Sequence, residues 1–269
     1  MIFRKETPVL LRLFFAISAV FSVLLPIFIE HIWPWIPVIL VGSFAALTAL
    51  GVIFLFIASL FCYTKKPIEK DNAFCRLLGY HTMDCIIAAC NAYPHGEGLE
   101  KVPDEPFVLV CNHQSQLDPM VAFVLLKGRQ LGFISKKENM RIPIVGPISQ
   151  KIGFLPLDRD NPLRAMRTIH FGAKMIKEMG FSMGIYPEGT RSRSGELLEF
   201  KTGAFVMAKR AGVPLVVSAI SGTKDATRRY PRPTHVNFRV LEVIPAEDVK
   251  AMTAEELAEK SREIIAAAL

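Results

Sequence analysis

The chain has 269 residues, 51% of them hydrophobic, and 32 basic against 25 acidic residues give it a formal net charge of +7. A basic excess suits a protein that lies against anionic lipid or handles phosphorylated and thioester-carrier ligands. Nucleic acid is the other class of partner for a basic chain. The sequence contains no recognisable nucleic-acid-binding motif, and we therefore expect no nucleic acid partner.

Apolar residues are concentrated in the first 63 positions. Residues 13–29 contain no charge, and residues 36–63 form a run of 28 uncharged, mostly apolar residues. A helix needs about 20 such residues to cross a bilayer core. Because only six residues, EHIWPW, separate the two runs, we predict a two-helix membrane hairpin over residues 1–63. A secretory signal peptide is the alternative for the first run, although no small-residue cleavage site follows it.

Basic residues flank the two apolar runs: Arg4, Lys5 and Arg12 precede the first run, and Lys65, Lys66 and Lys70 follow the second. The positive-inside rule then places both ends, and with them residues 64–269, on the cytoplasmic side. Prolines at positions 26, 34 and 37 leave open a re-entrant hairpin that enters only one leaflet.

The cysteines predict free thiols. They are odd in number and lack metal-finger spacing, and a chain that faces the cytoplasm keeps its thiols reduced. The five are Cys62, Cys75, Cys85, Cys90 and Cys111.

Residues 64–269 alternate between helical and strand-like patterns. Residues 71–93 have apolar side chains at helical spacing and predict an amphipathic helix near the membrane. Further helices are expected at 162–179 and 201–211, and a capping box formed by Thr253 and Glu256 predicts a final helix. The strand-like runs are FVLVC (107–111), LGFIS (131–135), GFLPL (153–157), SMGIY (182–186), PLVVSAI (214–220) and VNFRVLEVI (236–244). This alternation predicts an α/β domain with a mostly parallel mixed sheet flanked by helices.

Four of the predicted strands are followed by polar turns. NHQSQLD follows FVLVC, KKEN follows LGFIS, LDRDN follows GFLPL and PEGTRS follows SMGIY. Ligands of open α/β sheets bind outside the carboxyl ends of the strands. We therefore expect the four turns to converge on one cleft.

The first turn places His113 five positions before Asp118. With His113 at the end of a strand and Asp118 in the first turn of the next helix, the carboxylate can hold one ring N–H. The other ring nitrogen is then free to act as a general base. The alternative is a pair that only caps the helix. A metal site is a weaker alternative, because two potential ligands do not make a set, and we expect no metal.

The turn YPEGTRS places a carboxylate, a flexible backbone position and a guanidinium side by side, at Glu188, Gly189 and Arg191. Arginine can grip a phosphate through two parallel hydrogen bonds, and glycine allows close approach. A surface turn with a solvated ion pair is the alternative.

Taken together, the motifs resemble those of the glycerolipid acyltransferase family. NHQSQLD resembles its first motif, KKENMRIPIVG through GFLPLDR its second, YPEGTR its third and VPLVVSAI its fourth, in the same order, over residues 112–220. With the hairpin, the resemblance is to bacterial members that acylate 1-acylglycerol 3-phosphate. It implies a protein of the bacterial inner membrane.

The resemblance also implies a reaction. A fatty acyl group would move from acyl-CoA or acyl carrier protein to the sn-2 hydroxyl of lysophosphatidate, giving phosphatidate without any cofactor. His113 would be the base and Asp118 would orient it. The family pattern further implies substrate-binding residues at Lys136, Arg159, Glu188, Gly189, Thr190 and Arg191. Asn139 stands where the family commonly has leucine, which leaves the choice between Lys136 and Lys137 open.

The motifs also allow alternative functions. The acceptor could instead be glycerol 3-phosphate, another lysophospholipid or a lyso-amino lipid. A membrane-bound hydrolase would use the same histidine and aspartate to activate water, although the chain has no GxSxG nucleophile turn. A non-catalytic module would bind lysolipid without turnover.

Overall fold

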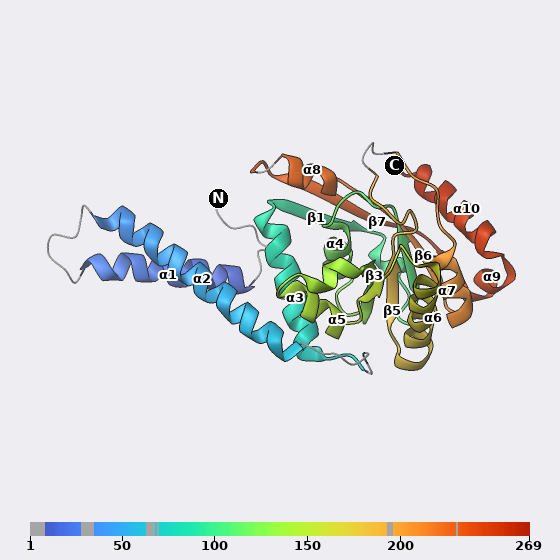
Figure 1. The fold of residues 1–269 in the computed structure, drawn as a ribbon. Coiled ribbons are helices and arrows are strands. Elements are labelled where there is room, and N and C mark those ends of the chain that lie inside the picture. Colours follow the sequence, from blue (N-terminus) through green and yellow to red (C-terminus); the bar gives the residue numbers. More distant parts are fainter. Residues whose placement is uncertain (1–8, 28–34, 63–67, 69, 193–195, 230) are drawn as a thin grey trace.

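The computed structural model describes residues 9–27, 35–62, 68, 70–192, 196–229 and 231–269. Two long helices project from one side of an α/β domain (Figure 1). The domain consists of one sheet with helices on both faces, as the alternating sequence pattern predicts.

The projecting helices are α1 (Val9–Ile27) and α2 (Ile36–Cys62), which pack along one another. Phe15 and Phe44 have ring centroids 5.2 Å apart, and the hydroxyls of Ser22 and Ser43 lie 2.7 Å from each other. The two predicted helices are therefore confirmed as helices. Among the described residues, α2 alone is long and apolar enough to cross a bilayer, and α1 has a shorter apolar core at Arg12–Leu24.

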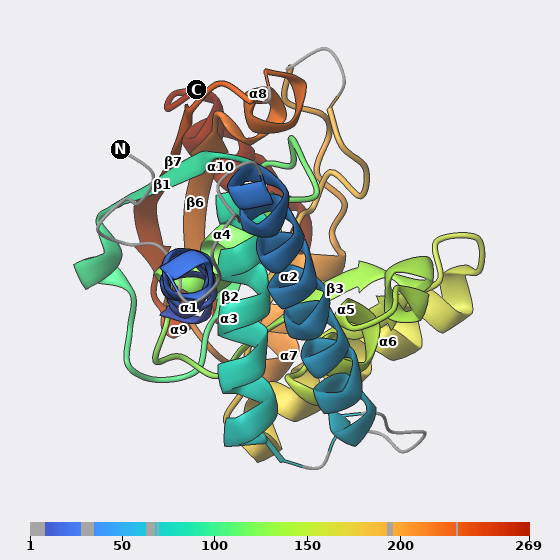
Figure 2. The ribbon, with the colours of Figure 1, turned by 90° about the vertical axis from the view of Figure 1, so that its left-hand side faces the viewer.

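Helix α3 (Ala73–Ala89) connects the hairpin to the sheet, and it lies beside α2 (Figure 2). Its first turn is capped by Asn72, whose side chain accepts the N–H of Cys75 at 2.9 Å. Buried Arg76 holds it to the domain by donating to the carbonyls of Leu131 and Ile152, each at 3.0 Å. The amphipathic helix predicted over 71–93 is thus present, but it is shorter and covers the sheet.

The prediction of five free thiols is wrong for one pair. Cys62, at the end of α2, and Cys75, in the first turn of α3, form a disulfide with a Cα–Cα distance of 6.1 Å. The packing of the two helix ends brings these side chains together, and a count of cysteines along the sequence cannot show this. Cys85, Cys90 and Cys111 are free.

Seven strands form the sheet, in the order β1-β7-β6-β2-β5-β3-β4. Their bounds are β1 Ala92–Glu97, β2 Val108–Cys111, β3 Leu131–Lys136, β4 Leu155–Leu157, β5 Ser182–Ile185, β6 Leu215–Ser221 and β7 Thr234–Ile244. Neighbouring strands are parallel except β6 and β7, which are antiparallel. The prediction of a mostly parallel mixed sheet is confirmed, and each of the six predicted strands is present.

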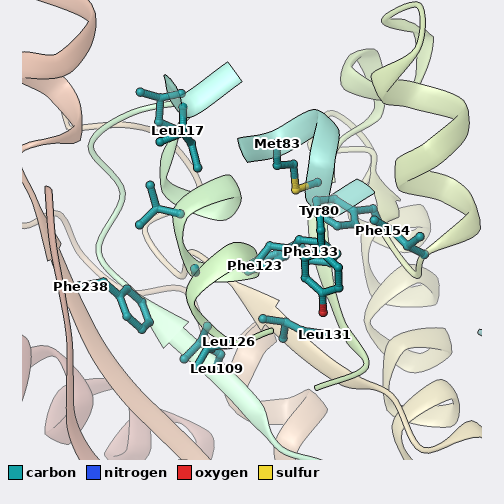
Figure 3. Packing of buried hydrophobic residues seen from close by; sticks show 14 of the residues in the cluster. Tyr80, Met83, Leu109, Leu117, Phe123, Leu126, Leu131, Phe133, Phe154 and Phe238 are labelled. Atoms are coloured by element: carbon teal, nitrogen blue, oxygen red, sulfur yellow. The ribbon is translucent and has the colours of Figure 1, made fainter. Parts of the chain in front are cut away.

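Side chains of alternate strand residues enter two separate cores. Leu109 and Cys111 pack under α3, α4 (Asp118–Leu125) and α5 (Val145–Lys151), whereas Val108 and Val110 pack on the opposite face. That opposite face is covered by α6 (Pro162–Met179), α7 (Gly203–Ala211) and α10 (Ala254–Ala266). The first core is rich in aromatic rings, with Tyr80 and Phe123 centroids 4.6 Å apart (Figure 3).

The remaining helices are short: the 3-10 helices η2 (Leu99–Lys101) and η3 (Lys137–Arg141), and the α-helices α8 (Thr223–Arg228) and α9 (Ala246–Ala251). The predicted capping box of α10 is present, with Thr253 and Glu256 bonded reciprocally. The predicted division into residues 1–63 and 64–269 falls at positions outside those described and stays a prediction.

Candidate active site

The first motif begins where β2 ends. Asn112 follows this strand directly, His113 is the next residue, and Asp118 is the first residue of α4. The Nδ1 atom of His113 lies 2.7 Å from Oδ2 of Asp118, whose side chain is fully buried, while the imidazole remains 15% exposed. A buried carboxylate that holds Nδ1 leaves Nε2, on the other side of the ring, for a ligand.

The same carboxylate oxygen also organises the turn itself. Oδ2 of Asp118 accepts the backbone N–H groups of Gln114 at 2.6 Å and Ser115 at 2.8 Å. Asp118 therefore fixes the turn before α4 and also holds the imidazole. It does not cap the helix, since the N-cap residue is Leu117 and no side chain there bonds to the first turn.

The third motif meets the first through Glu188. This buried carboxylate accepts the N–H of His113 at 2.6 Å and that of Leu198 at 3.1 Å. Burial raises the pKa of Glu188, and the two backbone donors oppose that rise. A second link runs from the N–H of Ser192 to the carbonyl of His113 at 3.0 Å. Glu188 therefore supports the histidine backbone, a role that the sequence motif did not reveal.

Two further residues hold the histidine in place. Tyr186 stacks on the imidazole with a centroid distance of 4.4 Å and an interplanar angle of 25°. The Asn112 side chain pairs with the main chain of Ile220 in β6, donating to its carbonyl at 2.9 Å and accepting its N–H at 2.8 Å. The fourth motif is thereby fixed beside the first.

The neighbouring cysteine does not have the properties of a nucleophile. Cys111 is buried, and burial raises the pKa of its thiol well above the ordinary value. Such a group stays protonated near neutral pH. Among the described residues, no three His, Cys, Asp or Glu side chains are grouped so as to hold a metal ion.

His113 lines a cavity of about 540 Å³ at the carboxyl ends of β3 and β5. Part of the wall is apolar and includes Met83, Phe133, Met140, Ile142, Phe154 and Met166. The polar wall carries the predicted residues Lys136, Arg159, Gly189, Thr190 and Arg191. Residues of all four turns that follow the strands line this cavity, as expected. Of the predicted site residues, only Asp118 and Glu188 do not line it.

Two arginines, Arg159 and Arg191, line the cavity, and their charges act on one another. Burial lowers the pKa of Arg159, nearby Glu138 raises it, and the charge of Arg191 lowers it again. Arginine remains charged despite such shifts. A pair of mutually repelling cations at one cavity wall is an arrangement that an anion would stabilise.

The structure distinguishes the two lysines of the second motif. Lys137 donates to Asp158 at 2.9 Å and to Asp160 at 3.4 Å, whereas Lys136 lines the cavity. A third lysine, Lys201, also lines the cavity and was missed in the sequence. A Cβ atom at Gly189, which has a φ of +69°, would lie 3.2 Å from Lys201 Nζ. Lys201 lies 12 positions after Gly189, and the spacing of the motifs does not indicate that the two residues are close together.

Comparisons with known proteins agree with this architecture. Residues 94–221 match the family model described as Acyltransferase. The chloroplastic 1-acyl-sn-glycerol-3-phosphate acyltransferase of Brassica napus is 37% identical over 150 residues, which are 54% of this chain and 43% of that protein. This chain thus matches less than half the length of that relative.

Two bacterial proteins are also similar. The 1-acyl-sn-glycerol-3-phosphate acyltransferase of Escherichia coli is 33% identical over 142 residues, which are 53% of this chain and 57% of that protein. The crystal structure of the 1-acyl-sn-glycerophosphate acyltransferase PlsC from Thermotoga maritima superimposes with a TM-score of 0.61 at 25% identity, covering 72% of this chain and 78% of that one. Residues 94–221 of this chain are therefore a domain of the Acyltransferase family.

Proposed function

We propose that the protein transfers a fatty acyl group from a thioester donor, acyl-CoA or acyl carrier protein, to the sn-2 hydroxyl of 1-acylglycerol 3-phosphate. The product would be phosphatidate. The relatives from Brassica napus and Escherichia coli are 1-acyl-sn-glycerol-3-phosphate acyltransferases, which supports this choice of reaction. The observation that carries it is the His113–Asp118 pair at a cavity with one apolar wall and one cationic wall.

The pair would act as general base. Nε2 of His113 takes the proton of the acceptor hydroxyl while its oxygen attacks the thioester carbonyl, and Asp118 stabilises the imidazolium that forms. When the tetrahedral intermediate collapses, the carbon–sulfur bond breaks and the thiolate receives the proton from Nε2. The transfer is direct, and no covalent acyl-enzyme is formed.

The cavity walls match the two parts of the acceptor. Its phosphate would bind Arg159 and Arg191, with Lys136 and Lys201 on the same polar wall. The apolar wall suits an acyl chain, because burial of each methylene contributes about 0.8 kcal/mol. Thr190 lies on the polar wall and Gly189 lets that turn approach the ligand.

The hairpin would hold this cavity at the bilayer surface. Apolar α1 and α2 suggest association with the membrane, and the basic residues at their flanks favour a cytoplasmic face of the bacterial inner membrane for the catalytic domain. A water-soluble thioester donor would then approach from the cytoplasm.

The reaction can be tested with purified full-length protein in phospholipid vesicles. Mass spectrometry would follow products from acyl-CoA and acyl carrier protein donors offered to lysophosphatidate, glycerol 3-phosphate, lysophosphatidylethanolamine and lyso-ornithine lipid. We expect phosphatidate as the main product, and none from His113→Ala. Free fatty acid as the main product would identify a hydrolase, and turnover confined to another acceptor would reject the proposed substrate.

A further inference from the structure

The second oxygen of the Asp118 carboxylate has a separate partner in the turn after β6. The hydroxyl of Thr223, the first residue of α8, donates to Oδ1 of Asp118 at 2.5 Å. Both residues are completely buried. Thr223 lies 105 positions from Asp118, just after the fourth motif, and the family resemblance assigns it no role.

The carboxylate is thus held at both oxygens. Oδ2 accepts from the imidazole Nδ1 of His113 and from the N–H groups of Gln114 and Ser115. Oδ1 accepts from Thr223. A buried charge is costly unless hydrogen bonds satisfy it. The Thr223 hydroxyl therefore satisfies the second oxygen, and it also prevents rotation of the carboxylate away from the imidazole.

The turn that carries Thr223 has little room to move. Gly222 has a φ of +87°, and a Cβ atom there would lie 2.2 Å from the carbonyl oxygen of His235. On the other side of the turn, Ile220 is paired through two hydrogen bonds with the Asn112 side chain. The hydroxyl is consequently fixed relative to β2, the strand that ends just before His113.

We propose that Thr223 is a positioning residue of the His113–Asp118 pair. It keeps the carboxylate of Asp118 aligned with Nδ1 of His113, so that the imidazole proton is held on Nδ1 and Nε2 stays available as the base. This inference rests on the proposed acyl transfer for its kinetic consequence. Its structural consequence, a fixed imidazole proton on Nδ1, does not depend on which reaction the protein performs.

The kinetic test compares Thr223→Val, which replaces the hydroxyl by a methyl group of similar size, with Thr223→Ser, which keeps the hydroxyl. We expect Thr223→Val to lower kcat about 10- to 100-fold, by analogy with the loss of a hydrogen-bond partner that orients a metal-binding side chain. KM for both substrates should remain unchanged, and Thr223→Ser should keep most of the wild-type kcat. The matched control is Ser218→Ala in β6, which removes another buried hydroxyl, one that donates to Val110.

A wild-type kcat in Thr223→Val would overturn the proposal, and so would an equal loss in Thr223→Ser. An effect confined to KM would do the same, because a positioning role acts on the base. If Thr223→Val fails to fold, as judged by its thermal transition, Thr223→Ala takes its place and the same criteria apply.

A second measurement separates this inference from the proposed reaction. In proton NMR of the full-length protein in detergent micelles, the Nδ1 proton between His113 and Asp118 should give a far-downfield signal that is absent in His113→Ala. The signal should persist in Thr223→Ser and disappear or broaden in Thr223→Val. If the wild type transfers no acyl group yet shows this pattern, the reaction is rejected and the positioning role stands. An unchanged signal in Thr223→Val rejects the role itself.

Discussion

The backbone N–H of His113 donates to the carboxylate of Glu188 at 2.6 Å, so that the first and third motifs are joined at the main chain of the histidine. The other oxygen of Glu188 accepts from Leu198. Replacement of this carboxylate should therefore displace the base as well as the third motif.

Glu188→Gln should reduce kcat, because an amide offers one acceptor oxygen for two N–H donors. Steady-state kinetics measures this loss.

Glu188 should also make the stability of the wild-type protein depend on pH, with the opposite trend to that usual for acidic residues. The pKa of Glu188 is raised above 4.5 by burial, so between 4.5 and the raised value the folded protein holds a proton that the unfolded chain has released. The unfolding free energy of the wild type, relative to Glu188→Gln, should fall as pH rises through this window. Thermal unfolding at a series of pH values measures the difference, and a rise would contradict the assignment.

The base itself can be tested by His113→Ala and Asp118→Asn. Both should lower kcat at least about 100-fold, the scale of general-base catalysis. The thermal transition of each variant should show that the domain is still folded. Cys111→Ala is the control, since the neighbouring buried thiol has no part in the reaction. Steady-state kinetics with lysophosphatidate in vesicles provides the measurement, and near-normal turnover in His113→Ala would exclude the mechanism.

The acceptor phosphate can be tested by Arg191→Ala. Loss of a charge-assisted hydrogen bond should lower kcat/KM for lysophosphatidate about 10- to 100-fold. Turnover of monoacylglycerol, an acceptor without phosphate, should change much less. Arg164→Ala is a suitable control, because this arginine pairs with Asp158 on the surface and does not line the cavity. Equal losses on the two acceptors would indicate a structural role for Arg191.

The hairpin can be tested by removing residues 1–54, which leaves the last turns of α2 in place. The shortened protein should float weakly with liposomes and act slowly on lysophosphatidate embedded in them. It should recover part of its activity on a short-chain, water-soluble acceptor, because a long chain leaves the bilayer only at about 0.8 kcal/mol per methylene. Full activity on liposomes would show that the hairpin has no part in substrate access.

The strands were predictable because buried parallel strands are short apolar runs that end in polar turns. The edge strand β1 was missed: its sequence, AYPHGE, contains a proline and a glycine, and only one of its six residues is buried. Proline is tolerated there because β1 has a neighbour on only one side. A search for apolar runs in the sequence could not reveal a strand that is mostly unburied.

The His113–Asp118 pair was predictable for a different reason: the two residues belong to one turn, and their geometry is local. Lys201 and Thr223 reach the site from separate segments, and Glu188 bonds to a main-chain N–H that leaves no trace in the sequence. Contacts between distant segments depend on strand order, which six apolar runs do not specify. The disulfide between Cys62 and Cys75 was missed for a similar reason, because it depends on how the ends of α2 and α3 pack together.

Ala58 and Cys62, near the end of α2, are buried in the same hydrophobic cluster as α3 and the first core of the sheet. The helix that would enter the bilayer is thus continuous with the interior of the domain and is not attached by a free tether. Such a connection restricts tilt and rotation as well as distance, so in a membrane the mouth of the cavity would keep one orientation toward the lipid surface. Encounters with the proposed acceptor would then occur in two dimensions, and their rate should follow the mole fraction of lysolipid in the membrane and not its total amount per volume of solution.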